Sequence, residues 1–396
     1  MGRGPAVSVG EHGPAAGPGR LGAGEGAPLD RPSPPPFVPA LTGVRAFAAL
    51  WVMLLHLTEV TTVLLPEPAA RAFGFIAWPG SLGVDVFFVL SGFIISYNYE
   101  AKFAGRVDRA RYLGFLRARL ARIYPVHLVL LLALVVVVRG VGVAPGGGID
   151  PARWSTQQLV ESLVLVHAWV GHTAAWNSVS WSISSEWLAY LLFPLMVRAA
   201  RQVVRLSGAA LVLAIAALAS VPAMRSTVER LVAGTPAMPP LQIVAEFLTG
   251  CVIYQLYRQG RGRAGLAAHP GWVLLAMVLG AALLFRLGAP AAWSVVLVPP
   301  LILGLAYGQG RATRVFAHPL MVYGGKISFA LYMTHYLWLW VMHYVFPLAT
   351  LVDASLPVRI GWVLAHALPM PLVAAATYHL VEEPARHWLM RGARRA

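Results

Sequence analysis

Apolar stretches long enough to cross a lipid bilayer recur along this chain from Leu41 to Leu380. Charged residues make up only 12% of the 396-residue sequence, whereas an ordinary soluble domain carries about 25%. Because a spanning helix needs about 20 mainly apolar residues, the sequence predicts an all-α integral membrane protein of about ten transmembrane helices. The expected helices cover 41–65, 81–100, 123–141, 179–197, 207–224, 241–258, 271–287, 291–308, 326–347 and 357–380.

The chain is strongly basic, with a formal net charge of +15. Nucleic-acid binding is one interpretation of such a charge. The Lys and Arg residues instead form short clusters between the apolar stretches, and the densest cluster is the loop 101–122. Cytoplasmic loops of membrane proteins carry this excess, and most clusters fall on the inner side when both termini are cytoplasmic. We therefore expect a multi-pass protein of the plasma or inner membrane, with both termini in the cytoplasm and no nucleic-acid partner.

The two ends of the chain differ from the apolar region between them. Residues 1–36 are rich in Gly, Pro and Ala and have no apolar core, so we expect a disordered cytoplasmic tail. Residues 37–384 are expected to form the transmembrane domain, and residues 385–396 a basic cytoplasmic C-terminus. The longest outer connection, 142–178, contains the apolar run Leu159–Val170, which is too short to span comfortably. It lies along the surface or dips back into the membrane, and the sequence leaves both interpretations open.

Ionisable side chains inside spanning helices are energetically costly and are candidates for function. Arg45 and His56 share the first expected helix. Their separation of 11 residues places both side chains on one helix face, about 16 Å apart along the axis. Arg45 near the cytoplasmic entrance suits recognition of a phosphate or a carbonyl group, and the imidazole of His56 can accept a proton. Alternatively, Arg45 reaches the inner headgroups and His56 makes a hydrogen bond between helices.

Other polar side chains interrupt later helices. Glu186 lies early in the fourth helix and needs an Arg or His partner, so it either polarises a catalytic His or stabilises the bundle through an ion pair. Ser328, Tyr332 and His335 form a polar stripe on the ninth helix, which a water-filled cavity or interhelical hydrogen bonds would explain. Asp85, near the outer end of the second helix, is an interface or capping residue in the simplest interpretation.

Metal chemistry and disulfide chemistry have little support in this sequence. Cys251 is the lone cysteine, which excludes a disulfide within the chain. No HExxH motif, paired cysteines or clustered histidines are present. We therefore expect no metal site.

Five sequence motifs, taken together and in this order, resemble those of the acyltransferase-3 membrane family. They are Leu41–Leu50 followed by His56, Gly83–Phe93, the basic run Arg117–Pro125, Ser180–Glu186, and Ile327–His335. The resemblance extends from Leu41 to about Pro384. It implies about ten helices and the transfer of an acyl group, usually acetyl from cytoplasmic acetyl-CoA, to a hydroxyl group on a sugar or glycoside.

The resemblance implies acyl-CoA as the donor substrate. CoA is polyanionic, and arginine or lysine side chains on the inner face would receive its phosphates. The donor-binding residues are then expected to be Arg45, Arg119, Arg122 and Lys326.

The acceptor is expected to be a hydroxyl of a sugar, a polysaccharide, or a glycosylated or macrolide natural product. His56 would take the hydroxyl proton as it attacks the thioester, and Glu186 would orient that histidine. An acyl-histidine intermediate is a second route. A transporter that uses Arg45, His56 and Glu186 as a proton relay remains the alternative function. The expected substrate-binding residues are Asp85, Ser182, Tyr332 and His335.

Overall fold

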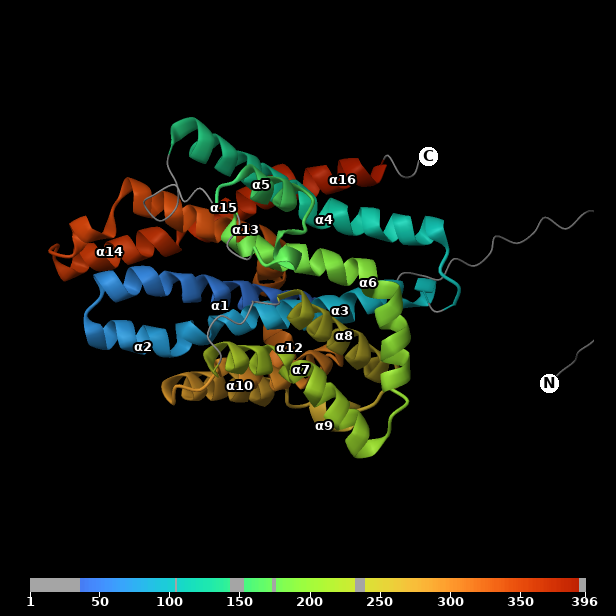
Figure 1. Ribbon diagram of the computed structural model, residues 1–396. Helices are drawn as coiled ribbons and strands as arrows, with labels where there is room; N and C mark the ends of the chain where they lie inside the picture. Colours follow the sequence, from blue (N-terminus) through green and yellow to red (C-terminus); the bar gives the residue numbers. More distant parts are fainter. Residues whose placement is uncertain (1–35, 104, 143–152, 173–175, 232–238, 392–396) are drawn as a thin grey trace, which may run out of the picture. The chain divides into compact units, whose positions relative to one another are not determined.

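Long helices, most of them apolar, make up the computed structural model, which describes residues 36–103, 105–142, 153–172, 176–231 and 239–391 (Figure 1). The compact unit of the fold is Pro36–Ala396. All regular elements in these described ranges are helices. The α-helices are α1 (Pro39–Leu64), α2 (Glu67–Ala77), α3 (Leu82–Phe103), α4 (Arg109–Val135), α5 (Thr156–Leu163), α6 (Trp181–Val203), α7 (Gly208–Leu231), α8 (Pro239–Arg258), α9 (Arg263–Leu266), α10 (Pro270–Arg286), α11 (Val298–Ala306), α12 (Gly310–Phe316), α13 (Pro319–Val345), α14 (Leu356–Ala367), α15 (Pro369–Thr377) and α16 (Glu383–Arg391).

Short 3₁₀ and π segments join or extend these helices. The 3₁₀ segments are η1 (Trp78–Ser81), η3 (His167–Val170), η4 (Ser178–Ser180), η5 (Ala291–Leu297) and η6 (Leu348–Leu351), and the π segments are η2 (Val136–Val141) and η7 (Tyr378–Glu382).

The expected spanning ranges are helical over almost their whole length. Among the described residues, 5 helices are long and apolar enough to cross a membrane, or up to 6 if the pair Ala291–Ala306 and Gly310–Phe316, bent by 83°, counts as one span. The helices α6, α8 and α13 do not meet this criterion, and they are the ones that carry Glu186, Glu246 and His335. The described residues therefore form an all-helical architecture with candidate membrane-spanning helices, and the number of ten spans stays a prediction.

Glycines bring the central helices into close contact. A Cβ atom on Gly325 of α13 would lie 1.9 Å from the carbonyl oxygen of Thr42 on α1. A Cβ atom on Gly92 of α3 would lie 2.0 Å from the carbonyl oxygen of Phe247 on α8. Small residues permit such backbone approach between membrane helices. The α1–α13 crossing brings the helix of Arg45 against the helix that carries His335, and α1 and α13 lie side by side in Figure 1.

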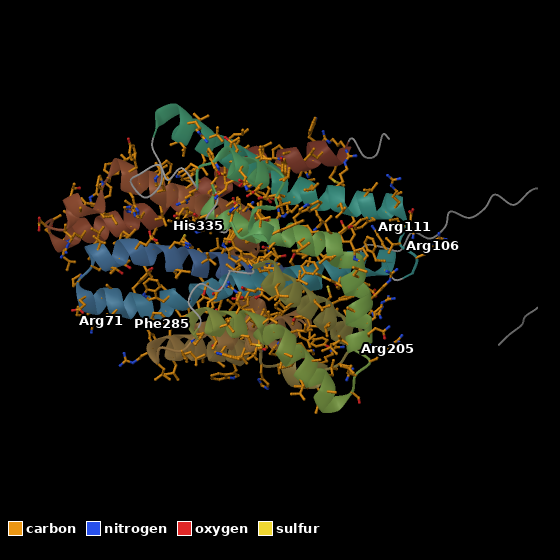
Figure 2. The ribbon with its side chains drawn as sticks, viewed as in Figure 1. Arg71, Arg106, Arg111, Arg205, Phe285 and His335 are labelled. Carbon is orange, nitrogen blue, oxygen red and sulfur yellow. The ribbon has the colours of Figure 1, made fainter. Side chains whose placement is uncertain are left out.

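The basic side chains labelled in Figure 2 separate along the helix direction. Arg106, Arg111 and Arg205 lie at one end of the helices and Arg71 lies at the other, with His335 between the two ends. From the sequence we expect the loops of Arg106, Arg111 and Arg205 on the inner side of the membrane and the loop of Arg71 on the outer side. The two sets thus lie at opposite ends of the helices, and the assignment of one end to the cytoplasm stays a prediction.

The described residues of the outer connection 142–178 pack against α4 and α6. The Tyr124 hydroxyl donates to the carbonyl of Leu163 over 3.0 Å, and the Trp169 indole N–H donates to the carbonyl of Ser184 over 2.7 Å. Ser184 also donates to the carbonyl of Leu165 over 2.8 Å, and Leu165 holds a left-handed φ of 59°, which is rare for a branched residue. The apolar run is thus a short helix, α5, followed by the turn η3, and it is attached to the helices on both sides.

The expected tails lie largely outside the described residues. This holds for residues 1–35 and for residues 392–396. The described part of the C-terminus is the helix α16, which packs on α4, where Arg117 donates to the carbonyl of Leu389 over 2.6 Å.

Candidate functional site

A cavity opens between α1, α3, α4, α6 and α13. Its volume is about 100 Å³, smaller than the roughly 300–1,000 Å³ of sites for drug-sized ligands. Most of the wall is aliphatic or aromatic. Its lining residues are Arg45, Val84, Phe87, Phe88, Leu90, Ser91, Ile94, Ile95, Arg119, Arg122, Ile123, Ser182, Ile183, Glu186, Tyr190, Phe329 and Tyr332.

Three arginines give this cavity a positive charge. Arg45 Nε donates to Ser328 Oγ over 3.3 Å, and Arg119 Nη2 donates to the Tyr99 hydroxyl over 3.3 Å. Neither side chain has a carboxylate within ion-pair distance among the described residues. Arg122 differs, because it forms an ion pair with the buried carboxylate of Glu382. Two guanidinium groups of the wall therefore have no ion-pair partner among the described residues, an arrangement that suits an anionic ligand.

Glu186 is the acidic member of the cavity wall. Its Oε1 accepts a hydrogen bond from Ser91 Oγ over 2.7 Å, and Tyr190 lies beside the same carboxylate. The sequence predicted that Glu186 orients His56. In the structure the hydrogen-bond partner of Glu186 is Ser91, so this predicted contact does not form among the described residues.

His56 pairs with His335. The distance from His335 Nε2 to His56 Nδ1 is 3.3 Å. His56 Nδ1 also lies 3.0 Å from the carbonyl oxygen of Val52, and His335 Nδ1 lies 3.2 Å from that of Leu331. A carbonyl only accepts, so in the neutral pair both Nδ1 atoms carry the proton. The His56 Nδ1–H is then shared between Val52 and His335 Nε2, which leaves His56 Nε2 unprotonated and able to act as a base.

The histidine pair lies behind the cavity wall. The Tyr332 ring belongs to the wall, and its centroid is 5.9 Å from the ring of His335. Phe87, also in the wall, meets Tyr332 edge-on at 6.3 Å between centroids. Tyr332 therefore stands between the cavity and His335, which in turn contacts His56.

The remaining predicted site residues divide into two groups. Ser182 lines the cavity and donates to the carbonyl of Val179 over 3.0 Å. Asp85 is buried outside the wall, where Gln242 donates to it over 2.9 Å and to Glu246 over 3.0 Å. Lys326 is exposed and also lies outside the wall. Substrate contacts of Asp85 and Lys326 thus stay predictions that the cavity geometry does not support.

Sequence reasoning did not identify three residues at this site: Ser91, Tyr190 and Glu382. Ser91 is a lone hydroxyl in the apolar run Gly83–Phe93, which is a weak signal of a facing polar group. Glu382 is buried, although it follows an expected span, and its partner Arg122 is 260 residues away in the chain. Nothing local in the sequence pairs the two.

No group of three or more His, Cys, Asp or Glu side chains that could hold a metal ion occurs within the part of the chain that the structure describes. The described side chains of the site supply imidazole, carboxylate and guanidinium groups at a largely apolar cavity.

Comparison of the sequence with known proteins gives a family match and two related sequences. The acyltransferase-3 family model, described as an acyltransferase domain, matches residues 38–378. Acyltransferase MdmB of Streptomyces mycarofaciens is 32% identical over 323 residues, covering 76% of this chain and 78% of that protein. Protein 2 in the picA locus of Rhizobium radiobacter is 37% identical over 103 residues, covering 26% of this chain and 46% of that protein. No solved structure matches the chain.

Proposed function

Since this chain belongs to the acyltransferase-3 family and is therefore an enzyme that transfers acyl groups, we propose that it moves an acyl group, acetyl first among them, from cytoplasmic acyl-CoA to a hydroxyl group. The acceptor is a sugar, a polysaccharide, or a glycosylated or macrolide natural product. In this proposal the protein crosses the plasma or inner membrane about ten times with both termini in the cytoplasm.

The observation that carries the proposal is the arrangement of the two histidines, which leaves His56 Nε2 free to accept a proton. The acceptor hydroxyl gives its proton to this nitrogen while its oxygen attacks the thioester carbonyl carbon. The C–O bond forms and the C–S bond breaks. The proton then passes from His56 to the departing sulfur, so the products are the ester and free CoA. Direct transfer of this kind needs no acyl-histidine intermediate.

The arginines of the cavity support the donor assignment. Phosphate groups of CoA meet Arg45 and Arg119, whose guanidinium groups have no carboxylate partner among the described residues. The apolar wall then surrounds the uncharged arm that carries the thioester. We assign the exposed Lys326 to the part of the donor that stays outside the cavity.

Glu186 has an electrostatic role in this scheme. It lies in the same wall as Arg45, and its negative charge stabilises the positive charge of that guanidinium. It limits the excess of positive charge in the cavity wall and keeps its hydrogen bond with Ser91. His56 depends on Val52 and His335 for its orientation instead.

The test is acyl transfer by the full-length protein in lipid nanodiscs. Radiolabelled acetyl-CoA is mixed with a panel of glycosylated macrolides and polysaccharides, and products are identified by mass. We expect a labelled ester together with free CoA. A nanodisc has no second compartment, so a transporter would form no product, and the absence of an ester with every acceptor would overturn the proposal. Label retained on the protein after an acid quench would replace direct attack with an acyl-histidine route.

A further inference from the structure

Two aromatic rings close the end of the cavity that faces the histidine pair. Phe87 on α3 and Tyr332 on α13 both line the cavity and contact each other, with 6.3 Å between their centroids. Tyr332 contacts His335 on its far side at 5.9 Å. His56 and His335 themselves are not part of the wall. The direct route for a thioester from the cavity to His56 therefore runs past these two rings.

The two rings differ in how firmly they are held. The Tyr332 hydroxyl donates to the carbonyl of Val179 over 3.1 Å, and the residue is only 8% exposed. Phe87 has no polar anchor and is partly exposed at the cavity. It is therefore the ring whose size sets the width of the passage.

We propose that Phe87 determines which acyl groups the enzyme transfers, by limiting the length of chain that passes between its ring and Tyr332. This inference rests on the proposed function, since it concerns the acyl group of the same donor. The space that the Phe87 ring fills lies next to Arg45, whose guanidinium carbon is 5.7 Å from the ring centroid. A longer acyl chain in that space would collide with the ring, whereas a short one would not.

A merely structural role for Phe87 makes a different prediction. If the ring only holds Arg45 in place, its removal weakens binding of every acyl-CoA to the same extent, because the CoA part is common to all of them. A role in selectivity changes the ratio between long and short acyl groups. The ratio is measured within one preparation, so a loss of folded protein does not affect it.

The experiment compares kcat/KM for acetyl-, butyryl- and hexanoyl-CoA in nanodiscs, for wild type and Phe87→Ala. The hexanoyl to acetyl ratio is expected to rise about tenfold or more, since single methylenes change selectivity by that order in apolar pockets. Phe87→Leu, a smaller change that is safer for folding, should give an intermediate ratio. The matched control is Ile94→Ala, which also removes an aliphatic part of the wall but lies about 10 Å from Phe87 along α3.

The outcomes of this experiment decide whether Phe87 sets the selectivity for the acyl group. An unchanged ratio in both Phe87 variants would overturn the inference while leaving acyl transfer intact. An equal rise in Ile94→Ala would also overturn it, because the effect would then come from general loosening of the cavity. If wild type transfers no acyl group from any of the three donors, the proposed function itself fails and this inference fails with it.

Discussion

Replacing His335 by leucine removes one of the two acceptors of the His56 Nδ1–H and leaves the other, the carbonyl of Val52, in place. A hydrogen bond of this kind contributes about 1–1.5 kcal/mol net, so kcat should fall about 5- to 13-fold. Leucine is close in size to histidine, and His335 is only 1% exposed, so the helix packing should persist. KM for acyl-CoA should not change, because His335 lies outside the cavity wall.

The assay is steady-state transfer in nanodiscs with acyl-CoA as the varied substrate. The control is Thr334→Val, which removes a neighbouring buried hydroxyl that is bonded to its own helix at Ala330 over 2.8 Å. It should leave kcat within about twofold of wild type, because that bond does not contact either histidine. A wild-type kcat in His335→Leu would refute the argument for the orientation of His56. A rise in KM with unchanged kcat would show that His335 contacts the donor instead.

Further substitutions test the ion pair of Arg122, the charged residues of the cavity wall and a buried histidine of the outer connection. Glu382→Gln leaves the part-buried Arg122 without its carboxylate partner and should destabilise the protein by about 1.5–3 kcal/mol. Thermal unfolding in detergent measures this, and an unchanged melting temperature would contradict it. Arg45→Ala should weaken acyl-CoA binding about tenfold, since it removes a charged hydrogen-bonding group. Glu186→Gln, which removes a negative charge from the same wall, should not weaken it; calorimetric titration that finds equal losses would reject the charge argument. Burial lowers the pKa of His167, in the outer connection, to about 4. Its neutral form therefore stabilises the fold above about pH 6.5, and this contribution is lost as the pH falls towards 4. His167→Asn should flatten the fall in melting temperature over that window, and an equal slope in both proteins would refute this.

The helices could be predicted from the sequence because a bilayer dictates their length and apolar character. Some of the helix boundaries could not be predicted in this way. The basic loop is largely helical, since the Asp108 side chain caps α4 by accepting from the backbone N–H groups of Ala110 and Arg111. The last expected span, 357–380, divides into α14 and α15. The helix α15 begins at Pro369. The amphipathic helix α2 was not predicted either, because it is too short to cross a membrane.

The sequence identified several site residues but not their partners. Arg45 and Glu186 stood out because charged side chains are rare in apolar helices, and both line the cavity. The pairing of His56 with His335 joins positions 279 residues apart. It depends on how closely α1 and α13 approach, which Gly325 permits. Such contacts arise from packing between distant segments, and periodicity within one segment carries no information about them.

The central claim is that His56 is the base that activates the acceptor. The most direct measurement is His56→Ala in the full-length protein, with transfer and acyl-CoA affinity determined on the same preparation. Transfer is expected to fall about 100-fold or more, while acyl-CoA affinity stays that of wild type because His56 is not part of the cavity wall. Product formation at the wild-type rate would contradict the claim.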